Sequence, residues 1–238
     1  MVNVSPAAGE LDPIAAPPIL AMCRPDAISE WRSLAHRVCA SEEWDRAGRF
    51  RTSALERRFL CGRVMLRYIL GEGVGAEPEA ILLRTEASGR LRAPDLDLEP
   101  SISYVHGRVG ALVGRGPIGL DLECPGRDVQ HDSLASHVLT EREITDFEKL
   151  SSIERRDFFF RRWVEKEAVS KAMGVGLSVG FAEFDASAGA EDLGGDLHLG
   201  HLDDGCLVAL LLPRGSPLPR PILWKGPGSA STLRIVWE

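Results

Sequence analysis

Apolar residues recur along this chain with two different periods, and each period predicts a different element. The segment 53–70 has a helical period, because its apolar side chains are three or four residues apart. Ser53 and Glu56 are spaced as a capping box at its start, and Gly71 is expected to stop it. Gly62 lies within the apolar face, so we expect close packing there. That face consists of Leu55, Phe59, Gly62, Leu66 and Ile69.

Other segments are short and apolar or alternate with a period of two, which is typical of strands. The turn Asp203-Asp204-Gly205 between two apolar runs indicates a hairpin. The sequence therefore predicts strands at about 81–84, 101–105, 109–114, 118–123 and 232–236, a loop over 85–100, a hairpin over 197–212, a helix starting at Thr140 with Glu143 in its capping box, and a helix over about 153–173 that ends at Gly174.

The order of these elements predicts an α+β fold, since helices and mostly antiparallel strands are segregated. Each half of the chain has a helix followed by strands, without a detectable repeat. We expect a loose lead-in over residues 1–25, an N-terminal half over 26–115 and a C-terminal half over 116–238 that carries the candidate chemistry.

Composition excludes several classes of function. The net charge is -7, which argues against broad nucleic-acid binding, because that usually needs a basic surface. The sequence contains no run of 18 apolar residues, so we expect no membrane span. The five cysteines are scattered without metal-ligand spacing, and they predict reduced thiols in a cytoplasmic protein.

The strand at 118–123 carries candidate metal ligands. Ile118, Leu120 and Leu122 alternate with Gly119, Asp121 and Glu123, so both acids project from one face. Carboxylate oxygens are ligands for a hard cation such as Mg²⁺. Gly119 on the same face would leave room for a ligand near the backbone. Taken alone, such acids are equally typical of the wet face of a half-exposed strand.

The helix at 153–173 carries a second candidate set. Only four of the 28 basic residues are lysines, and two of them, Lys166 and Lys171, lie in this helix. Trp163, Glu167 and Lys171 share one helical face, with Lys166 beside them. A compact ammonium charge suits a phosphate oxygen. Taken alone, Glu167 and Lys171 could be a surface ion pair and Trp163 a core aromatic. Their combination with the acids of the strand indicates an anionic ligand with a metal.

The two sets together resemble a known family. Gly119-x-Asp121-x-Glu123, followed by Trp163-x-x-Lys166-Glu167-Ala168-x-x-Lys171, is similar to the paired motifs of the Sfp-type (surfactin-synthetase-activating) 4'-phosphopantetheinyl transferases. Gly176-Leu177-Ser178 also looks like the family. The likeness runs from about residue 43 to about residue 212.

The resemblance implies a fold and a reaction. The fold would be two similar α+β halves related by a pseudo-twofold axis, in a monomer with its active site in the cleft between them. The reaction would move the 4'-phosphopantetheine arm of coenzyme A to a serine of an acyl or peptidyl carrier protein and release 3',5'-ADP. The carrier could belong to polyketide, nonribosomal peptide or fatty-acid synthesis, because the resemblance does not distinguish among them.

The resemblance also implies roles for residues. Asp121, Glu123 and Glu167 would hold Mg²⁺, or Mn²⁺ in its place. Glu167 would be the base for the serine proton, a metal ligand, or both, and Lys171 would assist at the phosphates. The residues implied to bind coenzyme A are Arg46, Arg58, Arg90, Ser103, Tyr104, Lys166 and Lys171, with Arg49 extending the basic segment.

The chain departs from the family at two places. Counted without gaps, Tyr104 stands where the family has a phosphate-binding histidine, and His106 would take that place only if the strand carried a bulge. Arg90 stands where the family has the lysine of a Gly-Lys-Pro motif. We therefore expect altered contacts to the phosphates of coenzyme A.

Two other functions fit the same acids. A nucleotide pyrophosphatase would use the same carboxylates with water as the nucleophile, and a binding module would hold carriers without chemistry. For a transferase, the carrier is expected to dock by apolar contacts on Leu134, Val138 and Leu139, between Arg127 and Arg142.

Overall fold

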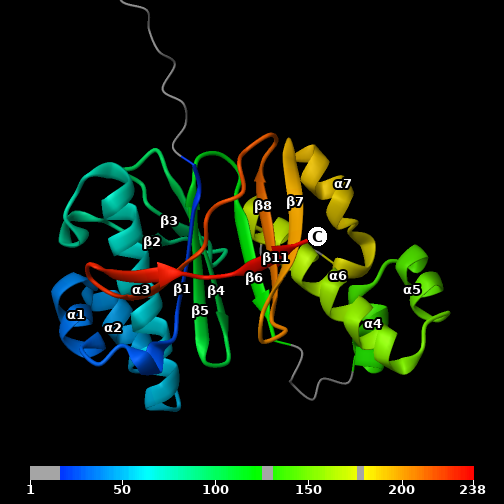
Figure 1. Ribbon diagram of the computed structural model, residues 1–238, viewed down its shortest axis with the longest axis horizontal. Helices are drawn as coiled ribbons and strands as arrows, with labels where there is room; N and C mark the ends of the chain where they lie inside the picture. The colour runs from blue at the N-terminus through cyan, green and yellow to red at the C-terminus, as the bar shows by residue number, and fades with distance from the viewer. Residues whose placement is uncertain (1–16, 125–130, 176–179) are drawn as a thin grey trace, which may run out of the picture.

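The computed structural model describes residues 17–124, 131–175 and 180–238, which form two large sheets with helices on their outer sides and one small two-stranded sheet (Figure 1). The strands are β1 (Ile19–Cys23), β2 (Arg84–Thr85), β3 (Leu91–Arg92), β4 (Glu99–Val105), β5 (Arg108–Gly114), β6 (Gly119–Glu123), β7 (Gly195–Leu202), β8 (Leu207–Pro213), β9 (Ile222–Gly226), β10 (Ser229–Thr232) and β11 (Ile235–Trp237). The helices are α1 (Trp31–Val38), α2 (Ser41–Ala47), α3 (Ser53–Val74), α4 (His131–Val138), α5 (Glu141–Phe147), α6 (Ser152–Met173) and α7 (Ala186–Asp192), with short 3-10 turns at Pro25–Ala27, Pro78–Ala80 and Phe181–Glu183.

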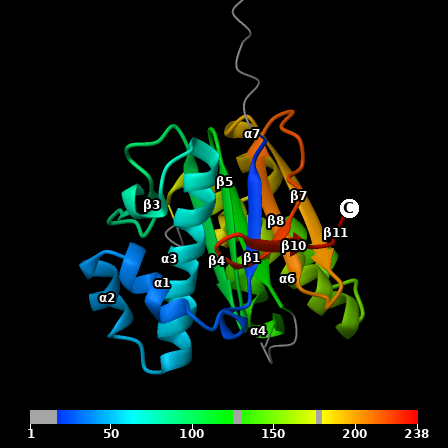
Figure 2. The ribbon, with the colours of Figure 1, turned by 60° about the vertical axis from the view of Figure 1, so that its left-hand side comes forward.

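The first sheet has the strand order β10-β9-β1-β5-β4 and is covered by α3, as the turned view in Figure 2 shows. Its central strand is β1, which pairs antiparallel with β5 and parallel with β9. The expectation of a loose lead-in over residues 1–25 is therefore wrong for 19–23. This run is apolar without alternation, because a central strand can be buried on both faces.

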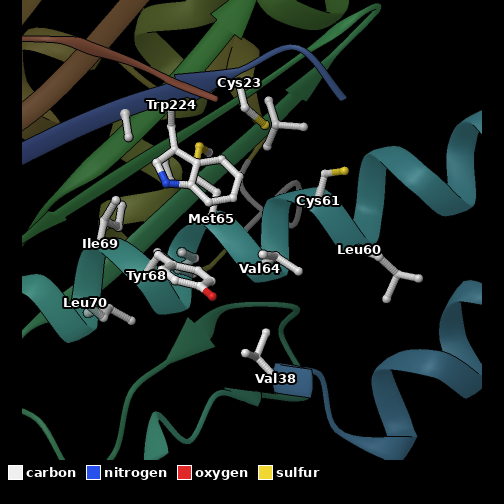
Figure 3. Packing of buried hydrophobic residues seen from close by; sticks show 14 of the residues in the cluster. Cys23, Val38, Leu60, Cys61, Val64, Met65, Tyr68, Ile69, Leu70 and Trp224 are labelled. Atoms are coloured by element: carbon white, nitrogen blue, oxygen red, sulfur yellow. The ribbon is translucent and has the colours of Figure 1, made fainter. Parts of the chain in front are cut away.

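The C-terminal strands β9 and β10 cross back to this first sheet. Trp224 of β9 is buried against Tyr68 of α3, with ring centroids 5.7 Å apart (Figure 3). The predicted division at residue 116 is therefore incomplete, because residues 222–232 belong to the sheet of the N-terminal half.

The second sheet has the order β11-β7-β8-β6, and α6 packs across β6 and β8. The two sheets meet at their edge strands β4 and β6 through side chains. The Ser101 hydroxyl accepts a hydrogen bond from the Leu120 amide at 2.9 Å, and the Ser103 hydroxyl accepts one from the Leu122 amide at 3.2 Å. These serines satisfy buried amides on β6 that would otherwise lack partners.

Local signals predicted several elements well, and the fold is α+β as expected. The helix α3 was predicted, but both of its predicted caps are wrong. Its N-cap is Thr52 and not Ser53, with the Thr52 hydroxyl accepting from the Leu55 amide, and it runs past Gly71 to its C-cap Gly75. Thr140 and Glu143 form the predicted capping box of α5. α6 ends at Gly174, which has a positive φ of 75°. None of the described helices is both long enough and apolar enough to cross a membrane.

The cysteines differ from the sequence-based expectation. Cys124, at the end of β6, forms a disulfide with Cys206, at the start of β8. The expectation that all five cysteines are reduced thiols is therefore wrong for this pair. Cys23, Cys39 and Cys61 are free, and burial raises the pKa of each thiol, to about 12 for Cys39 and Cys61. Thiols of that kind are inert at neutral pH.

Candidate active site

A cavity of about 590 Å³ lies where the two halves meet, between α2, α3, the β2–β3 turn, β4 and the last turns of α6. Its wall is apolar and strongly basic. Although the chain has a net charge of -7, only one carboxylate, Glu167, faces the cavity among the described residues that line it. The cationic side chains of the wall are Arg46, Arg58, Arg63, Arg90 and Lys171. Such a wall suits an anionic ligand with an apolar part.

Helix α6 presents the acid and the lysine to this cavity. Glu167 and Lys171 are one helical turn apart and both line it. Trp163 does not line it. Instead its ring packs against Phe159 and Phe181, with centroids 6.1 and 5.9 Å away. Trp163 is therefore a core aromatic that anchors α6, and the chemistry of the predicted stripe is confined to Glu167 and Lys171.

Lys166 lies on another side of α6 and is fully buried. Its ammonium donates to the Val138 carbonyl at 2.7 Å, to the Phe181 carbonyl at 2.8 Å and to Glu143 at 2.6 Å. Burial lowers the pKa of Lys166, and the Glu143 carboxylate opposes that shift. The prediction that Lys166 contacts phosphate is therefore wrong. The side chain joins α6 to the end of α4 and to the start of α5.

Strand β6 brings the predicted acids next to α6. The Lys171 ammonium lies 2.5 Å from Asp121 Oδ1 and 3.0 Å from the Leu120 carbonyl oxygen. The Ser103 hydroxyl donates to Asp121 Oδ1 at 2.8 Å. Ser103 therefore orients Asp121, and it does not line the cavity as a coenzyme-binding residue was expected to.

The acidic group has the chemistry of a hard-cation site. Burial raises the pKa of Glu167 to about 7; the charges of Asp121 and Glu123 add to this shift, and Lys171 opposes it. A cation would relieve that repulsion, so the donor set fits Mg²⁺. In the described ranges, no three acidic, histidine or cysteine side chains are already arranged around a single ion position. The metal assignment of these three carboxylates stays a prediction.

Three of the predicted arginines line the cavity. Arg58 lies on α3 and donates to the Val105 carbonyl at 3.2 Å. Arg46 lies over the Phe59 ring, 5.3 Å from its centroid. Arg90 is in the turn between β2 and β3, reaches α6 near Gly174, and pairs with Glu99 at 3.4 Å. Arg49 does not line this cavity but an adjacent pocket, which shares Arg46 and Phe50 with it.

The register of β4 decides whether Tyr104 or His106 faces the cavity. The β4–β5 ladder is continuous from Glu99↔Gly114 to Val105↔Arg108, so the strand carries no bulge. Tyr104 lines the cavity, whereas His106 is exposed in the turn that follows. The fold therefore supports the alignment without gaps, in which Tyr104 stands at the position of the family's histidine.

Among the wall residues that sequence reasoning did not assign to the site are Arg63 and Ser101. A signal for Arg63 was present, because it follows Phe59 by four residues and so continues the apolar face of α3. Ser101 precedes Ser103 by two residues on the same strand, and both contact β6.

Gly119 is required for α6 to lie against β6. A Cβ atom there would lie 1.8 Å from the Ala168 carbonyl oxygen and 2.8 Å from its carbon. The space that was expected to admit a ligand is thus filled by the backbone of α6. We predict that Gly119→Ala lowers the free energy of unfolding by about 3 kcal/mol or more, since backbone must move. Gly180→Ala, which meets open space, should change it little; denaturant unfolding would compare the two.

Comparison with known proteins agrees with this geometry. Residues 117–194 match the model of the 4'-phosphopantetheinyl transferase superfamily. The chain is 33% identical over 144 residues to the 4'-phosphopantetheinyl transferase HetI of a Nostoc species, a match that covers 58% of this chain and 61% of HetI. It is 29% identical over 184 residues to the mouse L-aminoadipate-semialdehyde dehydrogenase-phosphopantetheinyl transferase, covering 70% and 58%.

A third relative extends over more of its own length. The chain is 30% identical over 168 residues to the 4'-phosphopantetheinyl transferase psf-1 of Bacillus pumilus, covering 68% of this chain and 69% of psf-1. The matches to HetI and to a putative cyanobacterial transferase span about three fifths of those relatives. The extent of the match to psf-1, together with the superfamily match over β6 and α6, shows that the chain belongs to the 4'-phosphopantetheinyl transferase superfamily.

Proposed function

We propose that this protein is an Sfp-type 4'-phosphopantetheinyl transferase that moves the phosphopantetheine arm of coenzyme A to a serine of an acyl or peptidyl carrier protein. The observation that carries the proposal is the basic, partly apolar cavity with Glu167 and Lys171 on its wall. It offers cationic partners for phosphates, an apolar surface for a base, and one acid placed to accept a proton.

The reaction requires charge neutralisation, alignment and a base. Arg46, Arg58 and Arg90 would bind the phosphates of coenzyme A. Glu167 would accept the proton of the carrier serine as its oxygen attacks the phosphorus that carries the pantetheine arm. The bond from that phosphorus to the oxygen of 3',5'-ADP would break. Lys171 beside this acid would stabilise the charge that grows on the phosphoryl oxygens.

Mg²⁺ would be held by Asp121, Glu123 and Glu167, with Mn²⁺ as a substitute. When bound, it supplies charge neutralisation on the pyrophosphate. Ser103 supports this role for Asp121, since its hydroxyl and the Lys171 ammonium fix the position of Oδ1.

We also infer a pseudo-twofold relation between the halves. Each half has one helix of 22 residues packed on its own sheet, α3 in one and α6 in the other. Superposing the two halves tests this relation, and a superposition that fails to align α3 with α6 would reject it.

Mass spectrometry tests the function. An apo carrier protein incubated with coenzyme A, Mg²⁺ and this protein should gain about 340 Da, the mass of the transferred arm. Hydrolysis of coenzyme A without a gain in carrier mass would identify a pyrophosphatase instead. Carrier binding without either product would identify a binding module.

The expected carrier surface needs a correction. Val138, the last residue of α4, and Leu139 after it are buried in the core, so they cannot form the docking surface. Arg127 lies outside the described residues. Leu134, on α4, is 39% exposed and is the apolar residue of the expected set that a partner can touch.

We predict that Leu134→Asp raises the KM for the carrier about tenfold and leaves the KM for coenzyme A unchanged, because it puts a charge into an apolar contact. Steady-state kinetics with each substrate varied would measure both. Ile153→Asp is the matched control, since Ile153 is 85% exposed at the start of α6. Equal carrier KM values for wild type and Leu134→Asp would contradict docking on α4.

A further inference from the structure

Two polar side chains of the cavity wall have buried polar atoms that make no hydrogen bond in the described part of the chain. Arg63 is only 4% exposed, and its buried Nε and Nη1 atoms make no hydrogen bond within the described residues, although Nε lies 3.3 Å from Glu43 Oε1 in an ion pair. The Tyr104 hydroxyl is likewise buried without a hydrogen bond among those residues. Buried donors without acceptors are costly, so each calls for an explanation.

The two side chains lie together around Phe59. The Arg63 guanidinium carbon is 4.9 Å from the centre of the Phe59 ring, and the Tyr104 ring stacks on the same ring with centroids 6.4 Å apart. Gly62 lets them approach, because a Cβ atom there would lie 2.9 Å from the Tyr104 hydroxyl. We call Phe59, Arg63 and Tyr104 the buried wall of the cavity.

The charge behind the buried wall is not balanced. Arg63 and Arg67 share a single carboxylate, Glu43, with ion pairs of 3.3 and 2.8 Å. The Glu43 carboxylate also accepts from the Ala40 amide at 2.9 Å, and Arg67 donates to the Ile81 carbonyl as well. Arg67 is thus well satisfied, while the surplus positive charge and the unused donors are on Arg63, which faces the cavity.

We propose that Arg63 is a further ligand-binding residue, whose guanidinium acts with the Tyr104 hydroxyl to bind an anionic phosphoryl oxygen in the buried wall of the cavity. The site supplies a guanidinium fork and a neutral hydroxyl donor, which match the acceptor oxygens of a phosphate. This inference rests on the proposed function only for the identity of the ligand, a phosphoryl group of coenzyme A.

The experiment measures dissociation constants by titration calorimetry with 3',5'-ADP, adenosine 3'-phosphate, adenosine 5'-diphosphate and adenosine. Arg63→Met should raise the Kd for 3',5'-ADP about 10- to 100-fold, and Tyr104→Phe about 3- to 10-fold, as expected for charged and neutral donors. The Kd for adenosine should not change. The phosphorylated probe whose Kd rises most in Arg63→Met, adenosine 3'-phosphate or adenosine 5'-diphosphate, identifies the phosphoryl group that occupies the site.

The variants are matched to separate binding from folding. Arg63→Met leaves Glu43 and Arg67 as a balanced pair, so the protein should keep its melting temperature within a few degrees. Arg220→Met is the control, because Arg220 is an exposed arginine that does not line this cavity. If Arg63→Met fails to fold, Arg63→Lys decides instead: weaker binding of 3',5'-ADP with unchanged binding of adenosine supports the proposal.

Two results would overturn the inference. One is that the Kd values for 3',5'-ADP and for adenosine 5'-diphosphate in folded Arg63→Met are both within about threefold of wild type. The other is an equal loss of affinity for adenosine and 3',5'-ADP, which is the mark of a structural role. Carrier modification is measured separately. If the wild-type protein transfers no phosphopantetheine arm to a carrier, the proposed function is rejected. Nucleotide binding through Arg63 would not be affected by that result.

Discussion

Replacing Glu167 by glutamine should lower the rate of carrier modification about 100-fold or more, while the KM for coenzyme A changes much less. Glutamine keeps the shape of the side chain but cannot accept the serine proton, and a lost general base costs about this factor. Glu191→Gln, an exposed acid on α7, is the control. A Glu167→Gln variant as active as wild type, beside an inactive Asp121→Ala, would mean that Glu167 is only an acid of the cavity wall.

The pH dependence gives a second view of the same group. In the metal-free protein the pKa of Glu167 is raised from 4.5 to about 7, mainly by burial, so this side chain should ionise near pH 7 there. The folded protein holds this proton where the unfolded chain has lost it, so the contribution of Glu167 to stability falls as pH rises from 4.5 to about 7. In metal-free buffer at pH 8, Glu167→Gln should therefore unfold at the same temperature as wild type or at a higher one, and thermal unfolding followed by circular dichroism would measure this.

Removing divalent metal should abolish transfer, with a loss of more than about 1,000-fold. The three predicted ligands are carboxylates, and without a cation their repulsion and that of the pyrophosphate are unrelieved. A chelator followed by Mg²⁺ or Mn²⁺ should stop and then restore the gain in carrier mass. Circular dichroism should show that the chelated protein is still folded.

The matched variant for this prediction is Asp121→Asn, which keeps the shape of the side chain and its contact with Ser103. It should raise the Mg²⁺ concentration needed for half-maximal activity. Full transfer in metal-free buffer would overturn the metal assignment of Asp121, Glu123 and Glu167.

Local pattern determined much of this protein. The helical period located α3 and α6, and alternation located β6, because one buried face is enough to produce either signal. The spacing of Glu167 and Lys171 also placed both side chains on one face of α6, and the structure brings that face to the cavity. These features depend on residues that are close in the sequence.

Tertiary structure alone decided the rest, because helical spacing does not say which neighbour a face will meet. Lys166 was expected at the phosphates, yet the carbonyls of Val138 and Phe181 enclose it. Strand β1 was missed since it is buried on both faces and has no alternation. The surplus positive charge on Arg63 depends on Glu43, 20 positions earlier, which pairs with both Arg63 and Arg67. No local sequence pattern predicts that division of charge.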